Sequence, residues 1–185
     1  IHQGLGVWPG HQRVARDLQG QAVELLLPAQ VGQRLLIGGA AQIRAQIAER
    51  EVDMALGVVK LIKITAAHDV GRAINPLLVE GQVEGGIAQG IGLALMEEYV
   101  PGRTENLHDY LIRTIGDVPP IESILIEVPD PEGPFGAKGL GEHVLIPTAP
   151  AILNAIRHAT GVLVTKVPAT PTRLRAAIRA GESAR

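Results

Sequence analysis

The chain has 185 residues, of which 46% are apolar, a formal net charge of −2 and no cysteine. The near-neutral charge, without a lysine or arginine stripe, argues against a surface that binds nucleic acid. The absence of cysteine excludes disulfides, zinc–thiolate sites and Cys-ligated iron–sulfur clusters within the chain.

The sequence also lacks the patterns of a metal centre or a membrane anchor. Its six histidines are widely separated and no His-Glu-x-x-His occurs, so we expect no metal held by protein ligands. No apolar run approaches the roughly 20 residues that span a membrane, and the first residues do not resemble a signal peptide. We therefore expect no membrane span and a cytoplasmic location.

The first part of the chain is weakly patterned, and the sequence predicts a separate segment over 1–45 before a domain over 46–185. Four apolar residues between Arg13 and Leu27 recur at roughly helical spacing. This spacing predicts a helix over 13–27, which Pro28 would end.

Clearer signals begin after residue 46. Apolar residues predict two strands, over 47–53 and 58–66, and Gly57 between them makes a hairpin plausible. A polar connection then ends in Asn75 and Pro76, which are suited to the cap and the first position of a helix. That helix is expected to continue to about residue 98.

The predicted helix has two distinct faces. Its core stripe recurs every four residues and consists of Val79, Val83, Ile87, Ile91 and Leu95. Another face carries Gln82, Gly86 and Gln89, with Gly85 beside them. Because glycine inside a helix costs about 1 kcal/mol relative to alanine, a close neighbour is expected on that face. Either a closely packed helix or a ligand held by the carboxamides would explain it, and the residues alone leave both open.

The second half of the chain gives shorter signals. Residues 102–117 indicate a loop with a short strand around Tyr110, and alternating apolar residues predict a strand over 122–128. Thr148 is a candidate cap for a helix that Gly161 stops.

Two further elements complete the domain. A strand is predicted over 162–167, and Thr170 followed by Pro171 predicts the start of a last helix that reaches about residue 178. Strands and helices mix without a strict βαβ repeat, so the predicted class is α+β, with a mixed sheet and helices.

The loop over 133–142, Gly-Pro-Phe-Gly-Ala-Lys-Gly-Leu-Gly-Glu, has the most unusual composition in the chain. It is not a phosphate loop, because Gly139 rather than Ser or Thr follows Lys138. It is not a dinucleotide fingerprint, because Val144 stands where the third glycine belongs. Glycines at this density indicate close backbone approach to a bound group, beside which Glu142 would lie. The alternative is a tight surface turn with a solvated glutamate.

Several motifs together resemble the C-terminal portion of the large, molybdenum-binding subunit of the xanthine dehydrogenase/aldehyde oxidase family. They are His-Asp-Val-Gly-Arg-Ala-Ile-Asn-Pro within 66–76, Gly-Gln-Val-Glu-Gly-Gly within 80–92, the 133–142 loop with 145–150, and Pro-Ala-Thr-Pro at 168–171. The similarity extends from about residue 47 to 178, and residues 1–40 do not obviously match. The resemblance implies the C-terminal molybdopterin-binding domain of that family.

The resemblance also implies roles for individual residues. The family's catalytic glutamate corresponds to Glu142, and its cofactor-binding glutamine corresponds to Gln82. The remaining residues expected beside the cofactor are Gln89, Gly86, Lys138, Gly139 and Gly141, the last three through their backbone. His143 departs from the family pattern, in which a proline or small residue is common, and this departure leaves the substrate class open.

The implied activity is hydroxylation of an electron-poor carbon of an N-heterocycle, aldehyde or aryl-CoA, with water as the oxygen source and Glu142 as general base. The implied cofactor is molybdopterin with molybdenum, as such or as a dinucleotide. Iron–sulfur clusters and FAD are expected on partner chains. The chain is then a subunit or piece that joins a larger molybdenum-binding polypeptide, an iron–sulfur subunit and a flavin subunit, and acts on a small-molecule substrate.

Two alternatives stay open. A non-catalytic structural subunit, or a degenerate fragment of such a complex, would keep the fold without binding the cofactor. A hydrolase would use Glu142 with His143 or His68, although no nucleophile motif such as Gly-x-Ser-x-Gly supports it.

Overall fold

The computed structural model describes residues 13–16, 22–25 and 44–183. The chain divides into two compact units, Ile1–Ala41 and Gln42–Arg185.

In the first unit two short strands, β1 (Arg13–Arg16) and β2 (Ala22–Leu25), pair antiparallel. The helix predicted over 13–27 is therefore wrong at these residues. Val14 pairs with Glu24, and Val23 with Ala15. These β-branched valines favour extended backbone, and four apolar residues at approximate helical spacing were too weak a signal to oppose that preference.

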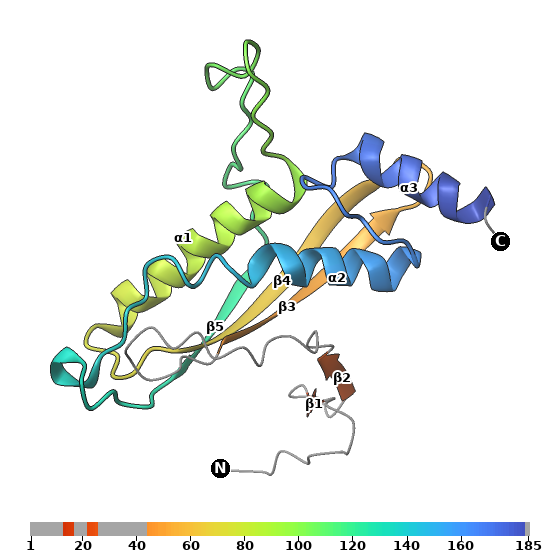
Figure 1. Ribbon diagram of the computed structural model, residues 1–185. Coiled ribbons are helices and arrows are strands. Elements are labelled where there is room, and N and C mark those ends of the chain that lie inside the picture. The colour runs from red at the N-terminus through yellow and green to blue at the C-terminus, as the bar shows by residue number, and fades with distance from the viewer. Residues whose placement is uncertain (1–12, 17–21, 26–43, 184–185) are drawn as a thin grey trace. The chain divides into compact units, whose positions relative to one another are not determined.

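The second unit contains a three-stranded sheet in the order β3 (Arg44–Asp53), β4 (Val58–Asp69), β5 (Ile121–Ile126) (Figure 1). β3 and β4 form the predicted hairpin, and the turn between them contains Gly57 at φ 70°. β5 pairs parallel to β4. The sheet is therefore mixed, as predicted.

The β3–β4 register contains a bulge. Glu49 pairs with Lys63, but the next residue, Arg50, pairs with Leu61, so Ile62 has no partner in the ladder. The extra residue reverses the alternation of side chains along β4. As a result Leu61 and Ile64, which are three residues apart, both pack against the core, while Ile62 is exposed.

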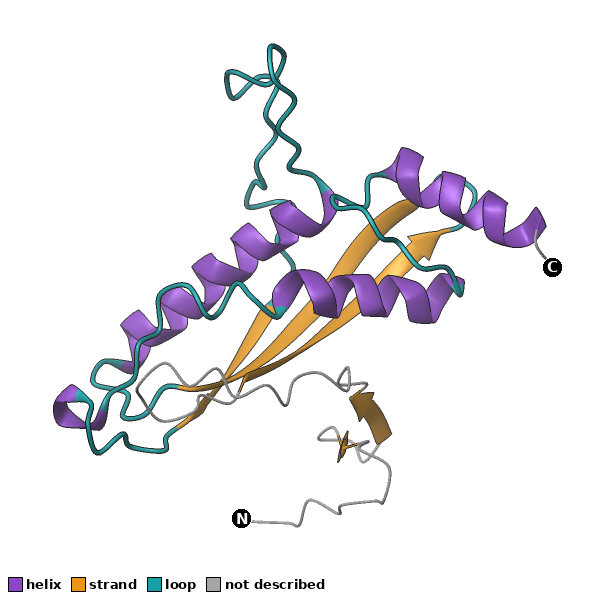
Figure 2. Ribbon diagram, in the orientation of Figure 1, coloured by secondary structure: helices purple, strands orange, loops and turns teal. Residues whose placement is uncertain are grey.

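Three helices accompany the sheet: α1 (Pro76–Leu95), α2 (Thr148–Thr160) and α3 (Pro171–Ser183). Figure 2 shows α1 and α2 lying next to each other over the sheet. None of the helices in the described part of the chain has the length and hydropathy needed to cross a bilayer.

The predicted helix signals are largely confirmed. Asn75 caps α1 by accepting a hydrogen bond from the Leu78 N–H, with Pro76 in the first turn, although α1 ends at Leu95 and not near residue 98. Gly161 ends α2 in the left-handed conformation, at φ 72°. Thr148 does not cap α2 as predicted. It is the first residue of the helix, and its hydroxyl donates to the Val144 carbonyl instead.

Two predicted strands are wrong. Neither the region around Tyr110 nor residues 162–167 is a strand, and no described strand pairs with them. A strand needs a neighbour for its backbone groups, and periodicity cannot reveal whether one exists. The Tyr110 hydroxyl instead donates to Glu97, and residues 162–167 connect α2 to α3.

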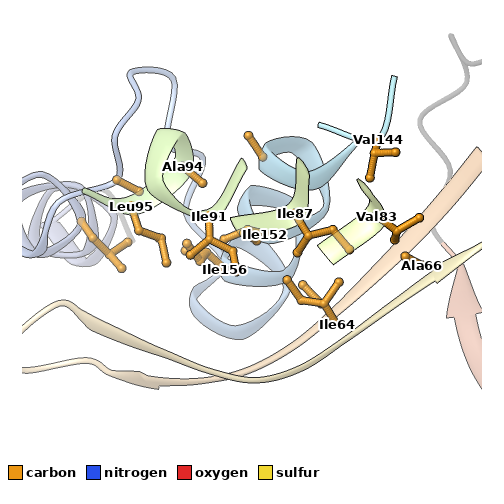
Figure 3. Packing of buried hydrophobic residues seen from close by; sticks show 14 of the residues in the cluster. Ile64, Ala66, Val83, Ile87, Ile91, Ala94, Leu95, Val144, Ile152 and Ile156 are labelled. Atoms are coloured by element: carbon orange, nitrogen blue, oxygen red, sulfur yellow. The ribbon is translucent and has the colours of Figure 1, made fainter. Parts of the chain in front are cut away.

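The core lies between the sheet and the helices and is aliphatic (Figure 3). Its fully buried members include Ile64 of β4, Val83, Ile87 and Ile91 of α1, Ile152 and Ile156 of α2, and Leu174 of α3. The predicted stripe of α1 is confirmed except at Val79, which is only partly buried. This core gives the loops at one end of the sheet a rigid support.

Candidate active site

The glycine-rich loop lies between β5 and α2, and its first half is attached to the end of β4. The Lys138 N–H donates to the Val70 carbonyl (3.0 Å), and the Arg72 N–H donates to the Gly136 carbonyl (2.8 Å). Gly71 makes this close approach possible, because a Cβ there would lie 2.4 Å from the Gly136 oxygen and its φ is 68°. The loop is therefore held by main-chain contacts at a position that only glycine fits.

A buried ion pair reinforces this attachment. The Lys138 ammonium lies 2.5 Å from Oδ2 of Asp69, and both side chains are only 3% exposed. Oδ1 of the same carboxylate accepts a hydrogen bond from the Gly71 N–H (3.0 Å). Because the Lys138 side chain is buried in this ion pair, any contact of Lys138 with a bound group would come from its backbone. Sequence reasoning missed Asp69, whose partner lies 69 positions away.

Phe135 was also missed. It occupies the left-handed region at φ 56°, which is rare for a residue other than glycine, and its side chain is 83% exposed. It borders a shallow hollow with Arg72, Ala73 and Ile74. Such backbone strain costs on the order of 1–3 kcal/mol and is found mainly at functional sites.

Glu142 is exposed and follows Gly141 at the end of the loop. Two residues later Val144 is fully buried, and its carbonyl accepts hydrogen bonds from the Gln46 amide (3.0 Å) and from the Thr148 hydroxyl (3.3 Å). The glutamate therefore extends from a short segment that is fastened to the protein on both sides.

The segment after Glu142 runs along α1, and two glycines of α1 allow the contact. A Cβ at Gly86 would lie 2.9 Å from Cβ of Val144, and a Cβ at Gly90 would lie 2.4 Å from Cβ of Thr148. Close packing, one of the two interpretations left open by the sequence, accounts for Gly86. Its direct contact with a cofactor stays a prediction.

The carboxamides of α1 lie beside these packed glycines, on the exposed side of the helix. Gln82 and Gln89 are both exposed. A Cβ at Gly81 or Gly85 would meet no heavy atom within 4 Å. This strip of α1 therefore offers amide donors and acceptors next to open backbone, an arrangement suited to a polar, uncharged edge of a ligand.

Two histidines pack behind the loop. The His68 and His143 rings meet edge to face with centroids 5.6 Å apart. Burial, followed by repulsion from His143 and Arg44, lowers the pKa of His68 to about 4. Burial, followed by the charge of Arg44, also lowers the pKa of His143. Both rings are therefore neutral near pH 7. His68 is fully buried, which argues against the hydrolase alternative that would use it.

Comparisons with known proteins test the resemblance to molybdenum-binding subunits independently of the site's geometry. A family model described as a molybdopterin cofactor-binding domain matches residues 38–119. The xanthine dehydrogenase molybdenum-binding subunit of Escherichia coli O157:H7 is 46% identical over 129 residues, covering 66% of this chain and 17% of that protein. The nicotine 6-hydroxylase large subunit of Paenarthrobacter nicotinovorans is 39% identical over 132 residues, covering 67% of this chain and 16% of that protein.

Comparison of the fold with solved structures points to the same family as the sequence comparisons. The solved structure of aldehyde oxidoreductase from Desulfovibrio gigas superposes with a TM-score of 0.72 at 36% identity, covering 75% of this chain and 15% of that one. This chain belongs to the xanthine dehydrogenase/aldehyde oxidase family of molybdopterin hydroxylases. It spans between 15% and 17% of the length of these three relatives.

The residues of this chain fit the cofactor that the family implies. A pterin presents polar edges to the protein and binds the metal itself, so the protein needs hydrogen-bonding groups and no metal ligands. The strip of α1 with Gln82 and Gln89 offers carboxamides beside open backbone at Gly81 and Gly85. Across the described part of the chain, no group of three or more His, Cys, Asp or Glu side chains is arranged to hold a metal ion. A molybdenum held by its pterin would need no such cluster.

Proposed function

We propose that this chain supplies the catalytic base and part of the cofactor-binding surface of a molybdenum hydroxylase. The observation that carries the proposal is the placement of Glu142. Its carboxylate is exposed at the end of a glycine-rich loop whose two ends are fastened to the protein. A general base must be accessible to the proton it removes and must hold its geometry.

The cofactor would be held by uncharged groups. Gln82 and Gln89 would donate to and accept from the polar edges of the pterin, and the backbone of Lys138, Gly139 and Gly141 would face it from the loop. When bound, the molybdenum cofactor supplies the acceptor for two electrons and the site at which water-derived oxygen is transferred. Glu142 would accept, on its carboxylate, the proton released in that transfer.

The substrate class we propose is an electron-poor carbon in an N-heterocycle, an aldehyde or an aryl-CoA. The relatives support this range, since their names include a xanthine dehydrogenase, a nicotine 6-hydroxylase and an aldehyde oxidoreductase. The cytoplasmic location expected from the sequence stays a prediction.

Partner chains are part of the proposal. Large apolar side chains lie in the open on α1 and on the loop after it, with Leu77 77% and Ile115 98% exposed. We interpret these exposed apolar side chains as part of a surface that a partner chain covers. We propose that a larger molybdenum-binding polypeptide covers it across roughly 2,000 Å² or more, and that electrons leave through iron–sulfur and flavin subunits. Size-exclusion chromatography with mass measurement of the native material tests this, and a molybdenum-loaded monomer of this chain would contradict it.

Glu142→Gln in the purified enzyme tests the catalytic role. The amide keeps the shape of the side chain but cannot accept the proton, so turnover should fall by roughly 10²–10⁴, with molybdenum content unchanged. Glu132→Gln is the matched control, because Glu132 is an exposed glutamate just before the same loop. Near-normal turnover in fully loaded Glu142→Gln enzyme would refute the assignment.

A further inference from the structure

The loop that carries Glu142 is held by two buried polar contacts, one on each side of it. Asp69 of β4 binds Lys138, four residues before Glu142, and Gln46 of β3 binds the carbonyl of Val144, two residues after it. We propose that Lys138, Asp69 and Gln46 are positioning residues that hold Glu142 in the geometry required of the base. This inference rests on the function proposed above.

The first contact is built to resist movement. With both side chains 3% exposed, water cannot take over the role of either partner when the loop shifts. The Asp69 carboxylate is itself oriented by the Gly71 N–H (3.0 Å). Lys138 therefore has one partner in a defined position, which sets where the backbone enters the Glu142 segment.

The second contact sets where the backbone leaves that segment. Gln46 is 9% exposed, and its amide nitrogen lies 3.0 Å from the Val144 oxygen and 3.2 Å from Nε2 of His68. Since the amide group that donates to Val144 also faces this ring nitrogen, Nε2 of His68 is the acceptor. A neutral imidazole thus fixes the orientation of the Gln46 carboxamide.

Both contacts originate from one rigid unit. Gln46 of β3 pairs with Ala66 of β4, and Asp69 is the last residue of β4. Between the two contacts, Leu140 is partly buried against the core, the His143 ring packs against His68, and the Glu142 carbonyl accepts a hydrogen bond from the Leu145 N–H (3.2 Å). The contacts of Lys138 and Val144 with adjacent strands are the two buried polar side-chain contacts that flank Glu142.

A purely stabilising role is the competing explanation, and an exposed ion pair between β4 and β5 provides a control. Lys63 of β4 lies 2.7 Å from Glu122 of β5, with side chains 41% and 43% exposed. Lys63→Met removes an exposed ion pair of the same sheet that has no contact with the loop. Its turnover should remain within about twofold of the unsubstituted enzyme.

The test uses the purified enzyme complex carrying Asp69→Asn together with Lys138→Met. The double substitution leaves no unpaired charge in the buried site. We expect kcat to fall by about tenfold to a hundredfold at unchanged molybdenum content and nearly unchanged KM, because a displacement of about 1 Å can cost roughly 10²-fold in rate. Gln46→Leu should act in the same direction with a smaller loss.

The decisive measurement combines these changes with Glu142→Gln, followed as single-turnover substrate oxidation over hours so that a slow residual reaction is measured. If the contacts act by aiming Glu142, the double substitution causes no further loss on this background. An equal loss with and without the Glu142 carboxylate would overturn the positioning role, and so would unchanged kcat in the double variant. Wild-type turnover in Glu142→Gln alone would instead refute the proposed function.

Discussion

Two pairs of glycines on α1 occupy contrasting surroundings. Gly86 and Gly90 face protein, and a Cβ at Gly90 would lie only 2.4 Å from Cβ of Thr148. Gly81 and Gly85 lie on the same helix, yet a Cβ at either would meet no heavy atom within 4 Å. Glycine in a helix therefore does not by itself show that protein packs against it, because two of these four glycines are in close contact and the other two face open space.

Among substitutions that test this difference between the glycines, Gly90→Ala should change the stability of the protein most. Overpacking against Thr148 costs about 3 kcal/mol, and the better helix propensity of alanine returns about 1 kcal/mol. We expect the free energy of unfolding of the assembled protein to fall by about 2 kcal/mol in chemical denaturation. An unchanged value would mean that α1 and α2 can separate without cost.

Gln82→Ala examines the open strip itself. If the carboxamide holds the cofactor, its loss leaves a buried polar group of the ligand unsatisfied, at about 1–3 kcal/mol. We expect molybdenum occupancy of the purified enzyme to drop, with activity per bound molybdenum largely retained. Full occupancy in a stable Gln82→Ala enzyme would show that this strip serves only as a surface for protein packing.

Gly85→Ala should give the smallest effect and the opposite sign from Gly90→Ala. The new methyl group enters open space beside a shallow hollow lined by Ile115 and Val118, and alanine is the better helix former by about 1 kcal/mol. The free energy of unfolding should rise by up to that amount. A decrease in the assembled enzyme would reveal that a partner or the cofactor fills the space.

Local signals in the sequence predicted much of the fold. The hairpin around Gly57, the Asn75 cap with Pro76 and the stop at Gly161 each depend on a few adjacent residues, and all three are confirmed. The strand predicted over 162–167 failed because a strand also requires a distant neighbour.

The candidate site likewise contains residues that local motifs could predict and contacts that they could not. Glu142 and Gln82 could be proposed from motifs, and their roles stay predictions. The contacts that fasten the loop could not be found from the sequence, because Lys138 meets Asp69 across 69 positions and Val144 meets Gln46 across 98. A lysine within a glycine-rich loop was the one available signal, and it was interpreted only through its backbone.

The parallel pairing of β5 with β4 has a consequence for how the site assembles. Ile64 pairs with Ile121 and Asp69 with Ile126, so the chain leaves both strands at the same end of the sheet, which brings Gly71 next to Ala137. Pairing of strands this far apart in the chain must overcome a large loop-closure entropy and is intrinsically slow. The base-bearing loop follows β5 in the chain, and we expect it to dock on the end of β4 after β5 has paired there. We therefore expect the active site to be among the last parts of the domain to acquire its native structure during folding.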